Sequence, residues 1–196
     1  MKKLKSSKKE NAGKQDYEKY RWFFTSGNKL VIGGKNAEQN EEVVRKAIKE
    51  NGKLIVMHTS SPGSPFSVIM SENPSESDLE ETAIFTGCFS RVWRERKEKA
   101  AIDIFLAEQL IKKNSMKTGT FGVVGEIDRK LIKPKLYLIK QKSKLRAVPF
   151  KTDKAISIIP GNINKEEFAE QIAIKMEIPV EEVLQALPTG GFQILK

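Results

Sequence analysis

The chain has 196 residues, enough for one medium-sized domain or for one domain with a small appendage. Its 35 lysines and arginines exceed its 25 aspartates and glutamates, and the net charge of +10 indicates an anionic partner, most simply a nucleic acid. The single cysteine excludes an internal disulfide, and no apolar run approaches the ~20 residues that a membrane-spanning helix needs. We therefore expect a cytoplasmic protein with no membrane partner.

The N-terminal segment, residues 1–15, is polar and lysine-rich and offers nothing that would fill a core, so we predict a disordered basic tail. Residues 1–14 carry six lysines and one glutamate, a charge of +5, which is half of the surplus of +10. The other half belongs to the rest of the chain. We predict a main domain at residues 16–160 and expect its surface to be basic.

The main domain begins with a pattern of short strands and one clear helix. In chain order, we predict a helical turn, two strands, a helix and two further strands at residues 16–20, 21–25, 29–32, 37–50, 53–58 and 66–71. The turn residues Ser26, Gly27 and Asn28 are typical of a hairpin between the first two strands. Asn36 is a typical N-cap for the helix that follows.

The second strong helix is predicted at residues 77–96, with Ser77 as its cap. Gly87 in its middle costs about 1 kcal/mol relative to alanine, which indicates close packing at that position. The segment 100–113 is ambiguous, because its alanine, leucine, glutamate and glutamine content favours a helix. Further strands are predicted at residues 121–124, 135–140, 145–150 and 156–159.

The composition changes after Pro160. Asn164 followed by Glu167 resembles a capping box, and Pro179 is suited to open a second short helix. Residues 161–196 are therefore predicted as a small helical appendage at the C-terminus. The expected fold class is α+β, a mixed or antiparallel sheet with two main helices packed on it, plus this appendage.

Five sequence blocks, in this order, resemble those of one known family. The blocks are Arg21–Phe24, Val31–Asn36, His58–Pro65, Thr86–Trp93 and Lys117–Phe121. Together they span roughly residues 17–140 and resemble the NFACT-R domain, the RNA-binding module of the NFACT proteins of ribosome quality control. The resemblance implies RNA binding, and it favours a strand leading into a basic loop at residues 100–113. Because the large N-terminal domain and coiled coil of full-length NFACT proteins do not fit in this chain, we expect a stand-alone form.

The turn Gly33–Gly34–Lys35–Asn36 is a candidate phosphate contact. Glycines let backbone N–H groups approach a phosphate, the following helix start has partial positive charge, and Lys35 adds a full charge. The alternative is an ordinary strand-to-helix turn. Three glutamates at the start of the helix oppose anion binding, namely Glu38, Glu41 and Glu42.

A second candidate is the basic stretch from Arg129 to Arg146, which holds eight positive residues and no acidic one. Such a run can neutralise phosphates and release counterions, or it can simply keep a hairpin soluble. The aromatic Trp22, which lies among arginines, is a candidate for stacking on a base, although core packing is the commoner role.

His58 is the only histidine and lies close in sequence to Ser60, Ser61 and Ser64. A nucleophile–base pair is one interpretation, and a structural or RNA-contacting imidazole is the other, favoured because no orienting acid can be recognised. One histidine and one cysteine cannot build a Cys/His zinc site, and no acidic cluster indicates magnesium. We expect neither a metal nor another cofactor.

The leading hypothesis is non-catalytic binding of tRNA or rRNA, linked to ribosome quality control or RNA modification, with the ribosome as a further partner. The residues that we predict to contact RNA are Arg21, Trp22, Gly33, Gly34, Lys35, Asn36, His58, Ser64, Arg91, Arg94, Lys112, Lys113, Lys117, Lys133 and Lys135. The second hypothesis is an RNA-modifying or nucleolytic enzyme that uses His58. The third is an adaptor that binds a protein partner through residues 161–196.

Overall fold

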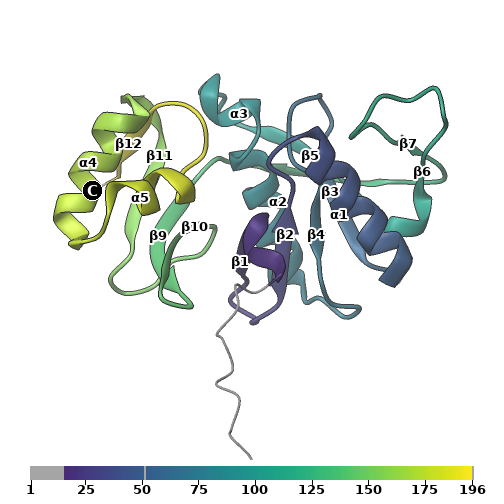
Figure 1. The fold of residues 1–196 in the computed structure, drawn as a ribbon, viewed down its shortest axis with the longest axis horizontal. Coiled ribbons are helices and arrows are strands. Elements are labelled where there is room, and N and C mark those ends of the chain that lie inside the picture. The colour runs from purple at the N-terminus through teal and green to yellow at the C-terminus, as the bar shows by residue number, and fades with distance from the viewer. Residues whose placement is uncertain (1–15, 51, 196) are drawn as a thin grey trace, which may run out of the picture.

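A six-stranded antiparallel sheet forms the larger part of the computed structural model, which describes residues 16–50 and 52–195 (Figure 1). The predicted disordered tail, residues 1–15, lies outside the described residues. The strand order is β1-β2-β4-β3-β5-β8. The strands are β1 (Arg21–Phe24), β2 (Leu30–Gly33), β3 (Ile55–Thr59), β4 (Ser67–Ile69), β5 (Ala100–Leu106) and β8 (Asp128–Ile132).

Two helices cover this sheet, α1 (Ala37–Glu50) on one face and α2 (Glu76–Cys88) on the other. Successive residues of β1 point to opposite faces, so Trp22 packs in the core under α1 and Phe23 packs in the core under α2. Because both faces are covered, the inner strands β2 and β4 are buried at nearly every position rather than at alternate ones. The predicted α+β class with antiparallel pairing and two main helices is confirmed.

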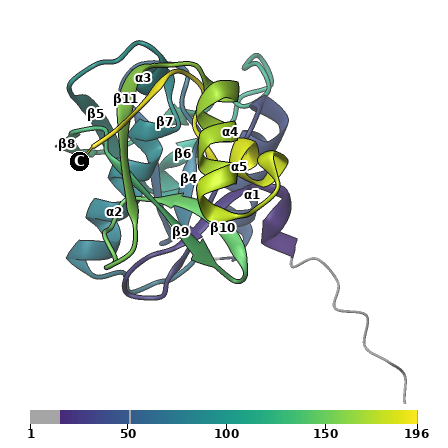
Figure 2. The ribbon, with the colours of Figure 1, turned by 90° about the vertical axis from the view of Figure 1, so that its left-hand side faces the viewer.

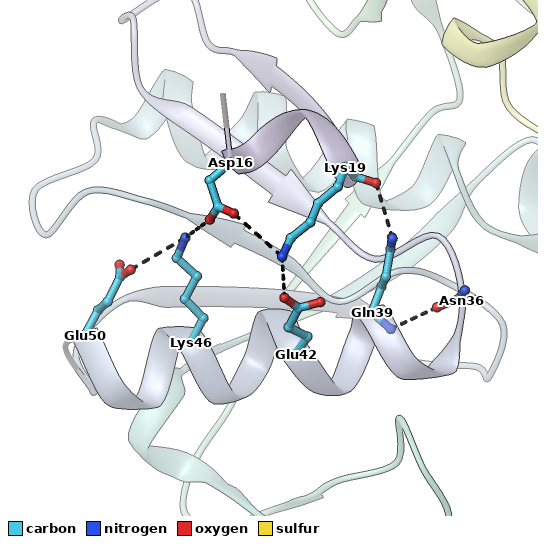
Figure 3. Close-up of polar contacts among 7 residues, drawn as sticks. All are labelled: Asp16, Lys19, Asn36, Gln39, Glu42, Lys46 and Glu50. Atoms are coloured by element: carbon cyan, nitrogen blue, oxygen red, sulfur yellow. Dashed lines mark hydrogen bonds and ion pairs between the residues drawn. The ribbon is translucent and has the colours of Figure 1, made fainter. Parts of the chain in front are cut away.

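The exposed side of α1 is held to the short 3-10 helix η1 (Asp16–Lys19) by a row of ion pairs (Figure 3). Lys19 pairs with Glu42 at 2.6 Å, and Lys46 pairs with Asp16 at 3.2 Å. Asn36 caps the helix as predicted, since its side-chain oxygen accepts a hydrogen bond from the backbone N–H of Gln39 at 2.8 Å. The N-terminal edge of the described fold is thus fastened to α1.

Two helical predictions needed correction. The predicted helix 77–96 is broken into α2 and α3 (Arg91–Arg94), because the Ser90 hydroxyl donates to Gly87 O at 2.6 Å and accepts from Val92 N at 3.1 Å. The cap of α2 is Ser75 rather than Ser77. The segment 100–113 begins as a strand, as the resemblance implies and against its helical composition: β5 pairs with β3 and β8 on its two sides. It continues through η2 (Ala107–Gln109) into β6 (Leu110–Ile111), which pairs with β7 (Gly122–Val123).

A second, four-stranded sheet lies at the other end of the molecule (Figure 1). Its order is β10-β9-β11-β12, and its strands are β9 (Leu136–Gln141), β10 (Lys144–Val148), β11 (Ile156–Ile163) and β12 (Phe192–Ile194). The helices α4 (Lys165–Met176) and α5 (Val180–Ala186) lie side by side over it (Figure 2) and share its core. The predicted cap Asn164 and the predicted first residue Pro179 both stand at the helix starts.

The two sheets are joined by specific contacts. The buried Trp93 of α3 donates its indole N–H to Gly191 O at 3.0 Å and packs on Phe192. The side-chain amide of Gln141 donates to Phe24 O at 2.7 Å and accepts from Phe24 N at 2.9 Å. The division at residue 160 stays a prediction, and β11 runs across that position. Within residues 16–50 and 52–195, no helix is long and apolar enough to cross a membrane.

Candidate nucleic-acid interface

A cleft of about 640 Å³ opens at one end of the six-stranded sheet, where three loops meet. The loops are the turn before α1, the connection between β3 and β4, and the segment before β7. Six of the residues predicted to contact RNA line this cleft together: Arg21, Gly34, Lys35, Asn36, His58 and Ser64. The sequence blocks that lie far apart along the chain therefore form one continuous surface.

The first wall of the cleft depends on a close approach at Gly34. A Cβ atom at this position would lie 2.6 Å from the backbone nitrogen of Asn40 and would also overlap the side-chain oxygen of Asn40. Asn40 in turn accepts a hydrogen bond from Phe66 N at 3.0 Å and donates to Ser64 O at 3.4 Å. Gly34 thus lets Asn40 hold the turn and the β3–β4 loop together.

The second wall is the loop from Thr59 to Phe66, which is braced internally. The Ser64 hydroxyl accepts a hydrogen bond from Thr59 N at 3.0 Å, and the Thr59 hydroxyl donates to Ser61 O at 2.5 Å. Ser64 is only 8% exposed, so this side chain shapes the loop more than it reaches into solvent.

His58 lies in the cleft with its ring on Phe66, at 4.4 Å between ring centres. Its Nδ1 atom lies 2.6 Å from Thr59 O, and because a carbonyl can only accept, Nδ1 carries the proton and Nε2 is left as an acceptor. Burial lowers the pKa of His58 below its ordinary value of 6.5. The neutral ring can therefore accept a hydrogen bond from a ligand inside the cleft.

We expect His58 to titrate below pH 6.5 and to populate the Nδ1–H tautomer at neutral pH. Since the unfolded chain takes up the proton first, the stability of the fold is full above pH 6.5 and falls as the pH is lowered through the depressed pKa of His58. Because the chain has one histidine, imidazole 15N shifts report this residue alone, and the denatured protein serves as the control. A midpoint at or above 6.5 in the native protein, or an Nε2–H tautomer, contradicts the expectation.

Two of the three serines near His58 are engaged elsewhere. Ser60 donates its hydroxyl proton to Asp103 Oδ1 at 2.7 Å, and Asp103 also accepts from Arg129 Nε at 2.6 Å. Ser64 bonds to Thr59 N as described above. Within the described part of the chain, neither of these two serines is hydrogen-bonded to the imidazole.

The third wall is tied to α1 by Glu41. Its carboxylate accepts from the Lys112 ammonium at 2.6 Å, from Gly119 N at 2.9 Å and from Arg45 at 2.8 Å. These donors lower the pKa of Glu41 to about 2, with the Lys112 hydrogen bond as the largest cause. Judged from the sequence alone, the negative charge of Glu41 opposes anion binding. In the fold, that charge is offset by its ion pairs with Lys112 and Arg45. Sequence reasoning missed this role of Glu41, because its partners Lys112 and Gly119 lie 71 and 78 residues away along the chain.

Lys112 shares in this structural role. Its ammonium also donates to Lys117 O at 2.7 Å and to Thr120 O at 3.1 Å, and its side chain is 19% exposed. Lys113 and Lys117 of the same loop are exposed beside the cleft. Of the three predicted lysines, Lys112 holds the loop and the other two have side chains at the surface.

The remaining predicted residues do not line the cleft. Trp22 is 3% exposed in the core, so its ring is not available for a base to stack on, and Gly33 is buried at the end of β2. Arg91 and Arg94 are exposed on α3. Lys133 is exposed after β8, and Lys135 lies with its ammonium 5.2 Å from the Tyr137 ring, in a groove of the second sheet.

Comparison with known proteins agrees with this arrangement. The family described as "NFACT protein RNA binding domain" matches residues 19–125, which include all three walls of the cleft. The chain is 29% identical to "Archaeal Rqc2 homolog aRqcH" of Methanocaldococcus jannaschii over 98% of its own length, and 32% identical to human "Ribosome quality control complex subunit NEMF" over 41% of its own length. It spans 31% of the archaeal relative and 8% of the human one.

The solved C-terminal part of the fibronectin/fibrinogen-binding protein from Streptococcus suis shares the fold. Its TM-score is 0.54 at 20% sequence identity, and the match covers 67% of this chain and 51% of that one. More than half of the described residues thus follow a backbone path known from a solved structure. The family match over residues 19–125, more than half of the chain, makes the chain a member of the NFACT RNA-binding domain family.

Proposed function

We propose that the protein binds tRNA or rRNA in the three-walled cleft, without converting it chemically, and that it acts in ribosome quality control. Membership of an RNA-binding domain family and the names of the archaeal and animal relatives support the proposal. The observation that carries it is the convergence of the predicted residues on one cleft of about 640 Å³.

The lining of the cleft suits an unpaired nucleotide. Phe121 lines the cleft, is partly exposed and offers apolar ring surface, whereas Phe66 and Phe105 are buried beneath it. Proteins recognise single-stranded RNA by stacking bases on such exposed rings. Arg21 and Lys35 supply positive charge at the same opening, beside the start of α1. The base would thus lie on the aromatic side of the cleft while its phosphate faces Arg21 and Lys35.

Binding is expected to weaken steeply with salt, because each neutralised phosphate releases counterions. We expect the affinity for tRNA or rRNA fragments to fall between about 50 and 200 mM salt, and Lys35→Gln to reduce the slope of log affinity against log salt by about 0.7–0.9. The matched control is Lys49→Gln, at the far end of α1, which should leave the slope unchanged. Fluorescence anisotropy with labelled RNA measures both quantities.

Salt-insensitive binding, or no binding at the lowest salt, contradicts RNA binding by this surface. The same incubations, analysed by denaturing gel and mass spectrometry, test the non-catalytic part of the proposal. A shortened or modified RNA that disappears with His58→Ala would favour the enzymatic alternative instead.

A further inference from the structure

A second, much smaller cavity lies where the two sheets meet. Its volume is about 40 Å³, and its walls come from β1, β10 and α5. Arg21, Trp22 and Arg146 line it, and Arg21 also lines the large cleft. The cavity therefore adjoins the proposed RNA site but is formed in part by the second sheet.

Three residues that line this cavity each carry a buried donor without an acceptor. They are Arg21 Nε, Trp22 Nε1 and Arg146 Nε, and no group among residues 16–50 and 52–195 accepts a hydrogen bond from them. Buried donors are almost always satisfied in folded proteins, and a buried charge costs more than a neutral group when it is not. Three such donors beside one cavity indicate a binding site for an acceptor.

The nearby carboxylates do not supply that acceptor. Glu18 accepts from the Lys144 ammonium at 2.6 Å, and Glu182 accepts from Leu145 N at 2.6 Å. Burial lowers the pKa of Arg21, and no carboxylate offsets this effect. Burial, and then the positive charge of nearby Arg21, lower the pKa of Lys165 at the start of α4.

Aromatic contacts account for the faces of the two guanidinium groups but not for their edges. Arg146 lies 4.0 Å from the centre of the Trp22 ring, and Arg21 lies 5.3 Å from the centre of the Phe89 ring. A guanidinium group keeps its N–H bonds in its own plane, so stacking leaves these donors directed past the ring. An anion with several oxygens can accept them.

We propose that this cavity binds one phosphate group, held by the guanidinium groups of Arg21 and Arg146, with the indole N–H of Trp22 as a third donor. A volume of about 40 Å³ suits a single phosphate and is too small for a nucleoside. The phosphate comes either from the RNA in the adjoining cleft or from free inorganic phosphate. The first source rests on the proposed RNA binding, whereas the second does not.

Thermal unfolding of the full chain tests the site with inorganic phosphate as the probe. At constant ionic strength, millimolar phosphate should raise the melting temperature of the wild type, since a ligand that binds only the folded state stabilises it. Arg146→Gln should lose this rise, and Arg21→Lys, which keeps the charge but not the planar fork, should lose most of it. Arg45→Gln, on the exposed side of α1, removes the same charge and should keep the rise in full. Equal rises in the wild type and Arg146→Gln, or no rise in the wild type, overturn the proposal.

RNA binding distinguishes the two sources of the phosphate. Arg146 lines the small cavity and does not line the large cleft, so Arg146→Gln is the variant that tests the small cavity most directly. If the phosphate belongs to RNA, this variant should bind RNA about tenfold more weakly, and inorganic phosphate should compete with RNA for the wild type. If the variant binds RNA as the wild type does while losing the phosphate-dependent rise, free phosphate is the ligand. If the wild type binds RNA but phosphate does not raise its melting temperature, only this inference is wrong. If phosphate raises the melting temperature but the wild type does not bind RNA, only the proposed function is wrong.

Discussion

Replacing Gly34 with alanine is expected to lower the free energy of unfolding by about 3 kcal/mol and to weaken RNA binding in the cleft. The new Cβ would lie 2.6 Å from the backbone nitrogen of Asn40, and this contact cannot be relieved by rotating a side chain. Moving Asn40 would break its bonds to Ser64 and Phe66, which hold two walls of the cleft together. Chemical denaturation and RNA anisotropy measure the two effects.

The neighbouring Gly33 provides a matched control. A Cβ atom there would lie 3.4 Å from both Pro65 Cβ and Ser67 Oγ, which is ordinary van der Waals contact. Gly33→Ala should therefore change the free energy of unfolding by no more than about 0.5–1 kcal/mol, and in the stabilising direction, since alanine is favoured over glycine within a strand. If Gly33→Ala and Gly34→Ala lowered the free energy of unfolding by similar amounts, the close contact between Gly34 and Asn40 would not be the reason that the turn needs glycine.

Replacing Glu41 with alanine is expected to cost about 2–3 kcal/mol and to release the segment 112–121 from α1. The variant leaves the ammonium of Lys112 and the N–H of Gly119 without their carboxylate partner. Because the segment forms the third wall of the cleft, RNA affinity should fall even though a negative charge has been removed. Hydrogen exchange across residues 112–121 and RNA anisotropy measure these effects.

The contribution of the Glu41 carboxylate to the stability of the fold should depend on pH between about 4.5 and 2. Its pKa is about 2 in the folded state against an ordinary value of 4.5, so the stabilisation is complete above pH 4.5 and is lost as the pH falls towards 2. The difference in stability between the wild type and Glu41→Ala should shrink over that range. Glu38→Ala, an exposed change in the first turn of the same helix, should cost no more than about 0.5 kcal/mol. A pH-independent difference would mean that the carboxylate charge is not what holds the loop.

Local sequence signals predicted the starts of α1 and α4 and the turn that builds the first wall of the cleft. Asn36 and Asn164 act as caps where the sequence placed them, because capping depends on residues only three positions apart. The glycine penalty within α2 was also informative, since a Cβ at Gly87 would lie 2.7 Å from the side chain of Ile132. The ordered motif blocks predicted which loops belong together.

Long-range pairing limited the rest of the prediction. The strand β8 was missed because its residues Asp128, Arg129 and Lys130 look like a solvated loop, and only pairing with β5 makes them a strand. Lys112 was read as an RNA contact because its partner Glu41 lies 71 residues earlier in the sequence. Trp22 stayed a candidate for stacking beside the commoner core role, because the sequence does not show that α1 covers its face of the sheet.

The two outer strands of the large sheet bear on self-association. At the β1 edge, the side-chain amide of Gln141 is hydrogen-bonded to both the backbone N–H and the backbone C=O of Phe24. These two groups are therefore not available to pair with a strand of a second molecule. On the β8 side, Arg129 and Lys130 stand on the strand that has no further neighbour. Charged side chains on an edge strand disfavour edge-to-edge pairing with a strand of another molecule, and so disfavour fibril formation. Arg129 and Lys130 belong to the basic stretch that indicates a polyanionic partner in the sequence. On the edge strand β8 they also help to keep the protein from polymerising.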